Sequence, residues 1–166
     1  MRLVRPSLEW EKEHRTYKEE WGSTRMIPSC FNLDGFDSYE AYLDDLVKKE
    51  KGLGKWLPFS SYFLVNDENR VLGMLDIRHE LNDFLYRIGG NIGYSVRPSE
   101  RKKGYATFIL SEALDKCREL EMGKVLVTCD EDNTGSAKVI LNNGGVEAHS
   151  EKDSDGTVKR RFWINL

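Results

Sequence analysis

The sequence predicts an α/β protein, because predicted strands and helices follow one another along most of the chain. Residues 92–96 alternate between two faces as a strand does, and an apolar helical stripe then runs over residues 106–120. A buried strand follows at residues 124–129, which completes a strand, helix, strand unit. Two predicted hairpins flank this unit: strands 62–65 and 71–77 before it, and strands 146–149 and 159–164 after it.

The composition indicates a single domain over residues 1–166. Charged residues make up 32% of the chain but the net charge is only -3, so no broad basic field is available for nucleic acid. The three cysteines, Cys30, Cys117 and Cys129, are widely spaced and form no metal-binding set with the three histidines. No apolar run is long enough for a membrane span or a signal peptide. We therefore expect a reduced, cytoplasmic protein with no metal, no membrane contact and no nucleic-acid partner.

The N-terminal third is predicted to be mainly helical. After a short strand at residues 3–4, Ser7 is placed to cap a helix. One face of that helix carries Trp10, His14, Tyr17 and Trp21. Because His14 falls within an aromatic stripe, we expect it to be packed rather than catalytic. The next helix is predicted to begin at a capping box formed by Asp37 and Glu40.

The segment from Arg101 to Ala106 follows the strand at 92–96 and is predicted to be the first turn of the next helix. The first N–H groups of a helix have no partners within the helix and lie at the positive end of its dipole. Gly104 removes a side chain where a ligand would approach, and Arg101, Lys102 and Lys103 add positive charge. This arrangement suits a pyrophosphate. The alternative is a solvated basic turn before an amphipathic helix.

Two blocks of residues lie in a fixed order along the C-terminal two thirds of the chain. The first is Arg101-x-x-Gly104-x-Ala106, and the second is Asn133-x-x-Ser136 followed by Asn143-Gly144-Gly145. Together they resemble the pyrophosphate loop and the later helix start and glycine turn of the GNAT superfamily of N-acetyltransferases. The resemblance extends from about residue 62 to the C-terminus. It implies an α/β fold with a mixed, partly antiparallel sheet, helices on both faces and a splayed central strand pair.

The resemblance also implies a site for acetyl-coenzyme A between the strands that end at Val96 and Cys129. By analogy, the backbone of Tyr94, Ser95 and Val96 would pair with the pantetheine arm. The pyrophosphate would be held by Arg101, Lys102, Lys103, Gly104, Tyr105 and Ala106. Asn133 and Ser136 would lie near the pantetheine or the thiol end of the cofactor.

Two positions depart from the family pattern. Where many relatives have a tyrosine acid in the helix after the asparagine, this chain has Ile140. Where a glutamate base often stands near the start of the cofactor strand, it has Asn91, which cannot take a proton at neutral pH. Glu80 is our substitute base, and Ser136 or Tyr94 is expected near the thiol.

The expected reaction is acetyl transfer from acetyl-coenzyme A to a primary amine by direct attack. The acceptor would be a small-molecule or peptide amine. The apolar loops around Phe31 and Trp56 can line its site, but core packing or a homodimer contact explains them equally simply. The alternative function, motivated by Ile140 and Asn91, is a weak or inactive coenzyme A-binding or sensing module.

Overall fold

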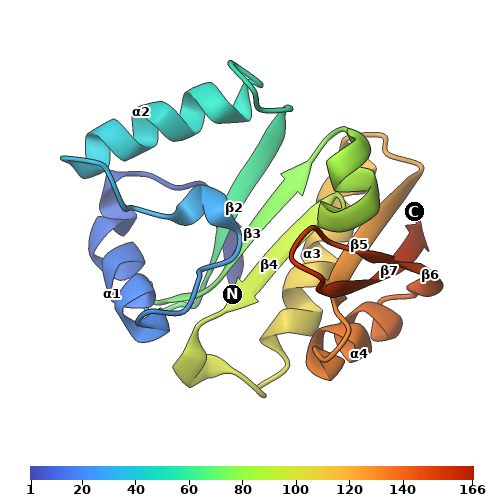
Figure 1. Ribbon diagram of the computed structural model, residues 1–166. Helices are drawn as coiled ribbons and strands as arrows, with labels where there is room; N and C mark the ends of the chain where they lie inside the picture. The colour runs from blue at the N-terminus through green and yellow to red at the C-terminus, as the bar shows by residue number, and fades with distance from the viewer.

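The computed structural model describes all residues, 1–166, and consists of a split sheet with helices packed on both faces (Figure 1). The strands are β1 (Arg2–Val4), β2 (Phe59–Val65), β3 (Val71–Arg78), β4 (Ile92–Val96), β5 (Lys124–Asp130), β6 (Val146–Lys152) and β7 (Val158–Asn165). The helices are α1 (Glu11–Trp21), α2 (Tyr39–Glu50), α3 (Tyr105–Glu119) and α4 (Thr134–Asn142). Short helical turns occur at η1 (Leu8–Trp10), η2 (Ser29–Phe31), η3 (Leu85–Gly89) and η4 (Pro98–Glu100).

The sheet is divided between β4 and β5. One part has the order β1-β2-β3-β4 and the other the order β5-β7-β6, and every pairing is antiparallel. Asn91, just before β4, holds the two parts together, because its N–H donates to the Leu126 carbonyl and its Oδ1 accepts from the Leu126 N–H. Beyond Asn91 no ladder joins β4 to β5. The expected splayed strand pair and mixed α/β fold are therefore confirmed.

Two hydrophobic cores lie on opposite faces of the sheet. The core under α3 and α4 is mainly aliphatic, and its 18 buried residues include Leu75, Ile109, Val127 and Phe162. The core under α1 and α2 has 14 buried residues and is rich in aromatic rings, among them Tyr17, Phe31, Tyr42 and Phe63. His14 is buried in this second core, where Nε2 bonds the Phe31 carbonyl and Nδ1 the Tyr39 hydroxyl. The prediction that His14 is packed is confirmed.

Several element boundaries differ from those expected. Helix α3 begins at Tyr105 rather than Arg101, because Lys102 and Gly104 have positive φ angles of 63° and 87° that an α-helix cannot contain. Ser38, not Asp37, caps α2 by accepting the Ala41 N–H. Ser7 precedes the turn η1, and its hydroxyl bonds Glu9 instead of capping the backbone.

The glycine pair before β4 ends a short helical turn. Gly89 ends η3, a π-helical turn, and Gly90 closes that turn by donating its N–H to the Leu85 carbonyl at 2.7 Å. Gly90 has a φ of 68°, and a Cβ there would lie 2.6 Å from the Leu126 carbonyl oxygen. Close approach to β5 therefore requires glycine at this position.

Candidate active site

A run of free backbone amides lies between β4 and α3. The N–H groups of residues 102–107 donate no hydrogen bond, and the first bond of the helix runs from the Phe108 N–H to the Gly104 carbonyl at 3.2 Å. No atom lies within 4 Å of the position where Gly104 would carry a Cβ, so the approach to these amides is open. Free amides at a helix N-terminus form a binding site for anions.

The three basic side chains of this loop differ in how free they are. Arg101 places its guanidinium over the Trp21 ring, 4.9 Å from the centroid, and its Nε is 3.4 Å from the Val96 carbonyl oxygen. Lys103 is bound to Glu100 at 2.8 Å, which raises the pKa of the lysine. Lys102 is exposed and has no acidic partner. The positive charge is therefore partly engaged by neighbouring residues, and the amides are the more open feature.

Strand β4 has one free edge. In an antiparallel pair, successive residues alternate between facing the partner and facing away. The Arg97 N–H bonds the Leu72 carbonyl and the Arg78 N–H bonds the Asn91 carbonyl, so residues 91, 93, 95 and 97 face β3. The backbone groups of Tyr94 and Val96 consequently face the gap toward β5.

Ser95 is directed differently from Tyr94 and Val96. Its backbone faces β3, and its hydroxyl lies 2.9 Å from the Tyr17 hydroxyl under α1. The expectation that Ser95 offers its backbone to a ligand in the gap therefore disagrees with the structure. The strand period of two explains the difference, because three consecutive residues cannot share one edge.

A hydroxyl pair lies where the gap meets α4. The Tyr94 hydroxyl is 2.8 Å from the Ser136 Oγ. Asn133 fixes the serine by accepting its N–H at 3.0 Å, as the N-cap of α4. Burial raises the pKa of Tyr94 to about 12, so the phenol keeps its proton at neutral pH. The pair can donate a proton beside the middle of the free edge of β4.

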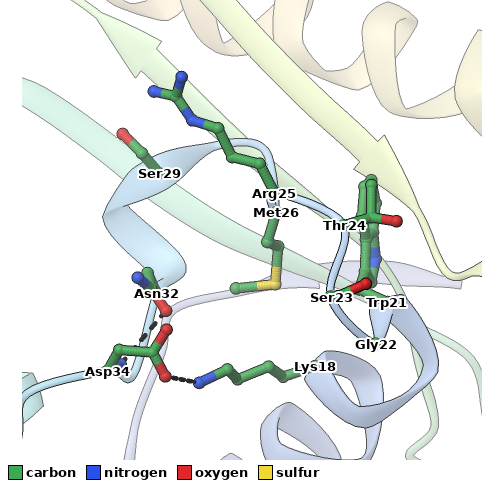
Figure 2. A pocket seen from close by; sticks show the side chains of 10 residues that line it. All are labelled: Lys18, Trp21, Gly22, Ser23, Thr24, Arg25, Met26, Ser29, Asn32 and Asp34. Atoms are coloured by element: carbon green, nitrogen blue, oxygen red, sulfur yellow. Dashed lines mark hydrogen bonds and ion pairs between the residues drawn. The ribbon is translucent and has the colours of Figure 1, made fainter.

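A cavity of about 350 Å³ lies between the end of α1 and the loop that follows it (Figure 2). Its lining consists of Lys18, Trp21, Gly22, Ser23, Thr24, Arg25, Met26, Ser29, Asn32 and Asp34. Pro28, within this loop, has its Cγ 3.3 Å from where a Cβ of Gly93 would stand. The cavity therefore lies beside β4, on the α1 and α2 face of the sheet. Of the loops considered for an acceptor wall, that of Phe31 has its phenylalanine fully buried in the core.

Comparison with known proteins decides the family. The family model described as the acetyltransferase (GNAT) domain matches residues 5–146. The chain belongs to the GNAT acetyltransferase family. It is therefore an acyltransferase of a family that uses acetyl-coenzyme A. No curated protein matches the sequence.

Solved structures of GNAT enzymes share the fold over almost the whole chain. The ribosomal L7/L12 alpha-N-protein acetyltransferase RimL, in complex with coenzyme A, has a TM-score of 0.71 at 12% identity, covering 99% of this chain and 93% of that one. A chimeric spermidine N-acetyltransferase from Vibrio cholerae gives 0.69 at 14% identity, with 99% and 96% covered. The ribosomal-protein-S5-alanine acetyltransferase from Vibrio fischeri gives 0.70 at 13%, with 98% and 91% covered.

The two positions that depart from the GNAT pattern have structural roles here. Ile140 is fully buried in the core under α4. Asn91 uses both ends of its amide, accepting from Leu126 and donating through Nδ2 to the Arg78 carbonyl at 3.0 Å. Asn91 therefore joins β3, β4 and β5, and neither position supplies an acid or a base.

Two carboxylates lie near the end of β3. Glu80, the predicted base, is exposed in the turn after β3 and makes no hydrogen bond. Asp76 is 5% exposed, with Oδ2 bound to Arg78 at 3.0 Å and Oδ1 without a hydrogen-bond partner. Burial raises the pKa of the Asp76 carboxyl. Asp76 belongs to the group of polar and acidic residues that the sequence places near this strand end, and it pairs in register with Gly93, next to Tyr94.

No helix has the combination of length and apolar character that a membrane span requires. No group of three or more histidine, cysteine or acidic side chains is arranged to hold a metal ion.

Proposed function

We propose that this GNAT protein transfers the acetyl group of acetyl-coenzyme A to a primary amine by direct attack. The observation that carries the proposal is the presence of two features along one strand edge. Free amides lie at residues 102–107 beyond Val96, and the Tyr94 and Ser136 hydroxyls lie beside the middle of β4. A diphosphate at the first feature and a thioester at the second would suit an extended cofactor along the edge.

Different residues would bind different parts of the cofactor along that edge. The amides of residues 102–107 would hold the diphosphate, with Arg101, Lys102 and Lys103 beside them. The backbone groups of Tyr94 and Val96 would bond the pantetheine arm, with Arg101 leaving the Val96 carbonyl as it does so. Asn133 would hold Ser136 in place through the helix cap. When bound, acetyl-coenzyme A supplies a thioester whose carbonyl carbon is attacked by the amine as the C–S bond breaks.

Tyr94 would act as the general acid. Its hydroxyl donates a proton to the departing sulfur and is reprotonated from solvent through Ser136. The raised pKa keeps the phenol protonated and ready to donate at neutral pH. The phenol would thus lie on β4, whereas many relatives carry their tyrosine acid on the helix, at the position that Ile140 occupies here.

The amine must be neutral to attack, so a base must remove a proton from it. We retain Glu80 for this role, acting through water because its side chain is exposed. Asp76 is a second candidate, since its free Oδ1 is buried beside the β4 residue Gly93. A covalent enzyme intermediate is not needed, and Cys129 does not suit one because burial raises the pKa of its thiol.

Thiol release and cofactor binding together test the proposal. The purified chain is incubated with acetyl-coenzyme A and a panel of amines, and free thiol is measured; coenzyme A binding is measured by calorimetry. The proposal requires acceptor-dependent thiol release and formation of the acetylated amine. Tight coenzyme A binding without turnover for every acceptor would instead establish the alternative, a coenzyme A-binding or sensing module.

A further inference from the structure

The cavity beside α1 is connected to two parts of the proposed cofactor site, the amide loop and strand β4. Trp21, at one end of its lining, contacts Arg101 of the amide loop. Met26 and Ser29 flank Pro28, which packs against β4 at Gly93, one residue from Tyr94. The cavity therefore lies on the α1 and α2 face of the sheet, opposite to the face that α3 and α4 cover. Its volume of about 350 Å³ falls within the range of small-molecule sites.

The charges that line the cavity are unbalanced. Lys18 and Asp34 form an ion pair at one end, as the dashed line in Figure 2 shows. Arg25 extends away from this pair and forms no hydrogen bond or ion pair with any residue. Asp34 is the only acidic residue in the lining, and Lys18 already neutralises it. The lining thus presents one uncompensated cation and no free carboxylate.

Three acidic side chains of adjoining elements are paired with arginines, whereas Glu19 on α1 is exposed and has no ion-pair partner. Glu13 and Glu20 on α1 both contact the guanidinium of Arg97, each at 3.1 Å. Asp76 on β3 is bound to Arg78. The carboxylates of Glu13 and Glu20 are therefore already engaged, and of Asp76 only the buried Oδ1 is free.

The neutral part of the lining offers hydrogen bonds. The hydroxyls of Ser23, Thr24 and Ser29 contact no protein partner, and the Asn32 side chain accepts the Asp34 N–H at 3.2 Å. Figure 2 draws the Arg25 guanidinium on the side of Ser29, with Ser23 and Thr24 farther along the lining. A free guanidinium in a lining with free hydroxyls suits a polar ligand with a carboxylate, to which arginine binds through two parallel hydrogen bonds.

We infer that this cavity binds the acceptor and that the acceptor is an amine carrying a carboxylate, with Arg25 contacting that carboxylate. The inference rests on the proposed function and names its substrate class. A polyamine would bring several positive charges to a lining with two cations and no free acid. The class is therefore separated from that of the spermidine acetyltransferase that shares the fold.

Matched acceptors test the inference. The chain is assayed with Ala-Asp-Ala-amide, Ala-Lys-Ala-amide, free aspartate and spermidine, and kcat/KM is measured for each. We expect the aspartyl peptide or free aspartate to exceed the lysyl peptide and spermidine by about tenfold or more. A preference for the peptide over free aspartate would identify a peptide as the source of the carboxylate, and the reverse would identify a free amino acid.

Two variants locate the selectivity. Arg25→Gln should remove the preference for the acidic acceptor, whereas Lys48→Gln, on the exposed side of α2, should leave it unchanged. Equal kcat/KM for acidic and basic acceptors, or a preference that survives in Arg25→Gln, would overturn the inference.

Direct binding separates this inference from the proposed function. Calorimetry with the same two peptides, with no cofactor present, should show tighter binding of the aspartyl peptide, and this difference should vanish in Arg25→Gln. If no amine is acetylated but this pattern of binding is seen, the proposed function fails while the cavity remains an anion-selective site. If neither peptide binds better than the other, the inference fails whatever the turnover.

Discussion

The two faces of β4 present different kinds of chemical group. On the face toward α3 and α4, the proposed cofactor site consists mainly of backbone: free amides at residues 102–107 and the open strand edge at Tyr94 and Val96. On the opposite face, the cavity beside α1 is lined by side chains from the loop after Trp21. Backbone groups suit a ligand that does not vary, and side chains suit one that differs between enzymes. Under the proposed function, donor and acceptor would thus be selected by separate means.

The two hydrophobic cores also differ in the kind of side chain that fills them. The core under α3 and α4 is largely aliphatic, whereas the core under α1 and α2 surrounds a buried imidazole with aromatic rings. His14 has the rings of Phe31, Tyr39, Tyr42 and Phe63 within 6.0 Å of its centroid. We call the half with α1 and α2 the acceptor half and the half with α3 and α4 the cofactor half, after the sites proposed for them. Only the acceptor half has a buried imidazole at the centre of its core. The difference between the halves can be tested by variants that affect one and spare the other.

The largest effect is expected from Gly104→Glu on the cofactor side. A negative side chain at φ 87° would repel a diphosphate and displace the free amides. Loss of two charge-assisted hydrogen bonds, at about 2 kcal/mol each, corresponds to about 1,000-fold weaker coenzyme A binding by calorimetry. Gly123→Glu, at the far end of α3, adds the same charge and should bind normally. Unchanged affinity in a folded Gly104→Glu protein would refute the site.

The next effect is expected from Tyr94→Phe. Removal of a general acid should lower kcat by about 100-fold while coenzyme A affinity stays within about twofold. Ser136→Ala should lower kcat less, because water can replace the serine as proton carrier. Tyr62→Phe, which removes a half-buried phenol with no hydrogen-bond partner, is the control. A Tyr94→Phe enzyme with full kcat would remove the phenol from the mechanism.

The third effect is expected on the free energy of unfolding at acidic pH, through His14 in the acceptor half. Burial lowers the pKa of His14 from 6.5 to about 4, so the folded state keeps the imidazole neutral while the unfolded chain takes up a proton. The stabilisation is complete above about pH 6.5 and is lost as the pH falls toward about 4. Between about pH 7 and about pH 5, the free energy of unfolding in urea should fall by about 2 kcal/mol more than in His14→Gln.

An NMR titration gives an independent measurement of the same group. The His14 imidazole should remain neutral at about pH 5, where an exposed histidine is charged. A His14 signal that titrates at its ordinary value would contradict the burial argument, whether or not the glutamine variant folds.

The smallest effect is expected from Glu80→Gln. An exposed carboxylate that acts through water should contribute on the order of tenfold to kcat/KM, below the usual range for a positioned base. Asp76→Asn is the comparison, since it removes the buried candidate with little change of shape. A loss confined to Asp76→Asn would transfer the role of base to Asp76 and withdraw it from Glu80.

The cofactor half was more predictable from the sequence than the acceptor half. The motif residues Gly104, Asn133 and Ser136 act through local backbone geometry, and Asn133 indeed caps α4. The start of α3 was predicted too early in the chain because Lys102 adopts a positive φ. A glycine at a position indicates such a conformation, whereas a lysine does not. The turn η3 was missed because a single π-helical turn has no period that a short polar segment can display.

The acceptor half depends on contacts between distant residues. Arg97, which in the sequence adds to a local basic cluster, is 1% exposed and bound by Glu13 and Glu20 on α1. Asp76 stands out among the acids near the end of β3 only because β4 brings Gly93 beside it. Arg25 becomes distinctive only because Asp34, the one acid in the cavity lining, is paired with Lys18. No local sequence pattern indicates which distant residues will contact one another. The residues could therefore be read from the sequence, but their roles could not be predicted from it.

The most direct test of the central claim is the backbone amide NMR spectrum of the ¹⁵N-labelled chain, recorded with and without coenzyme A. Binding of the diphosphate to residues 102–107 should shift these amide signals more than those of any other segment, with Gly104 among the largest. Saturable binding of coenzyme A that leaves the signals of residues 102–107 in place would contradict the account.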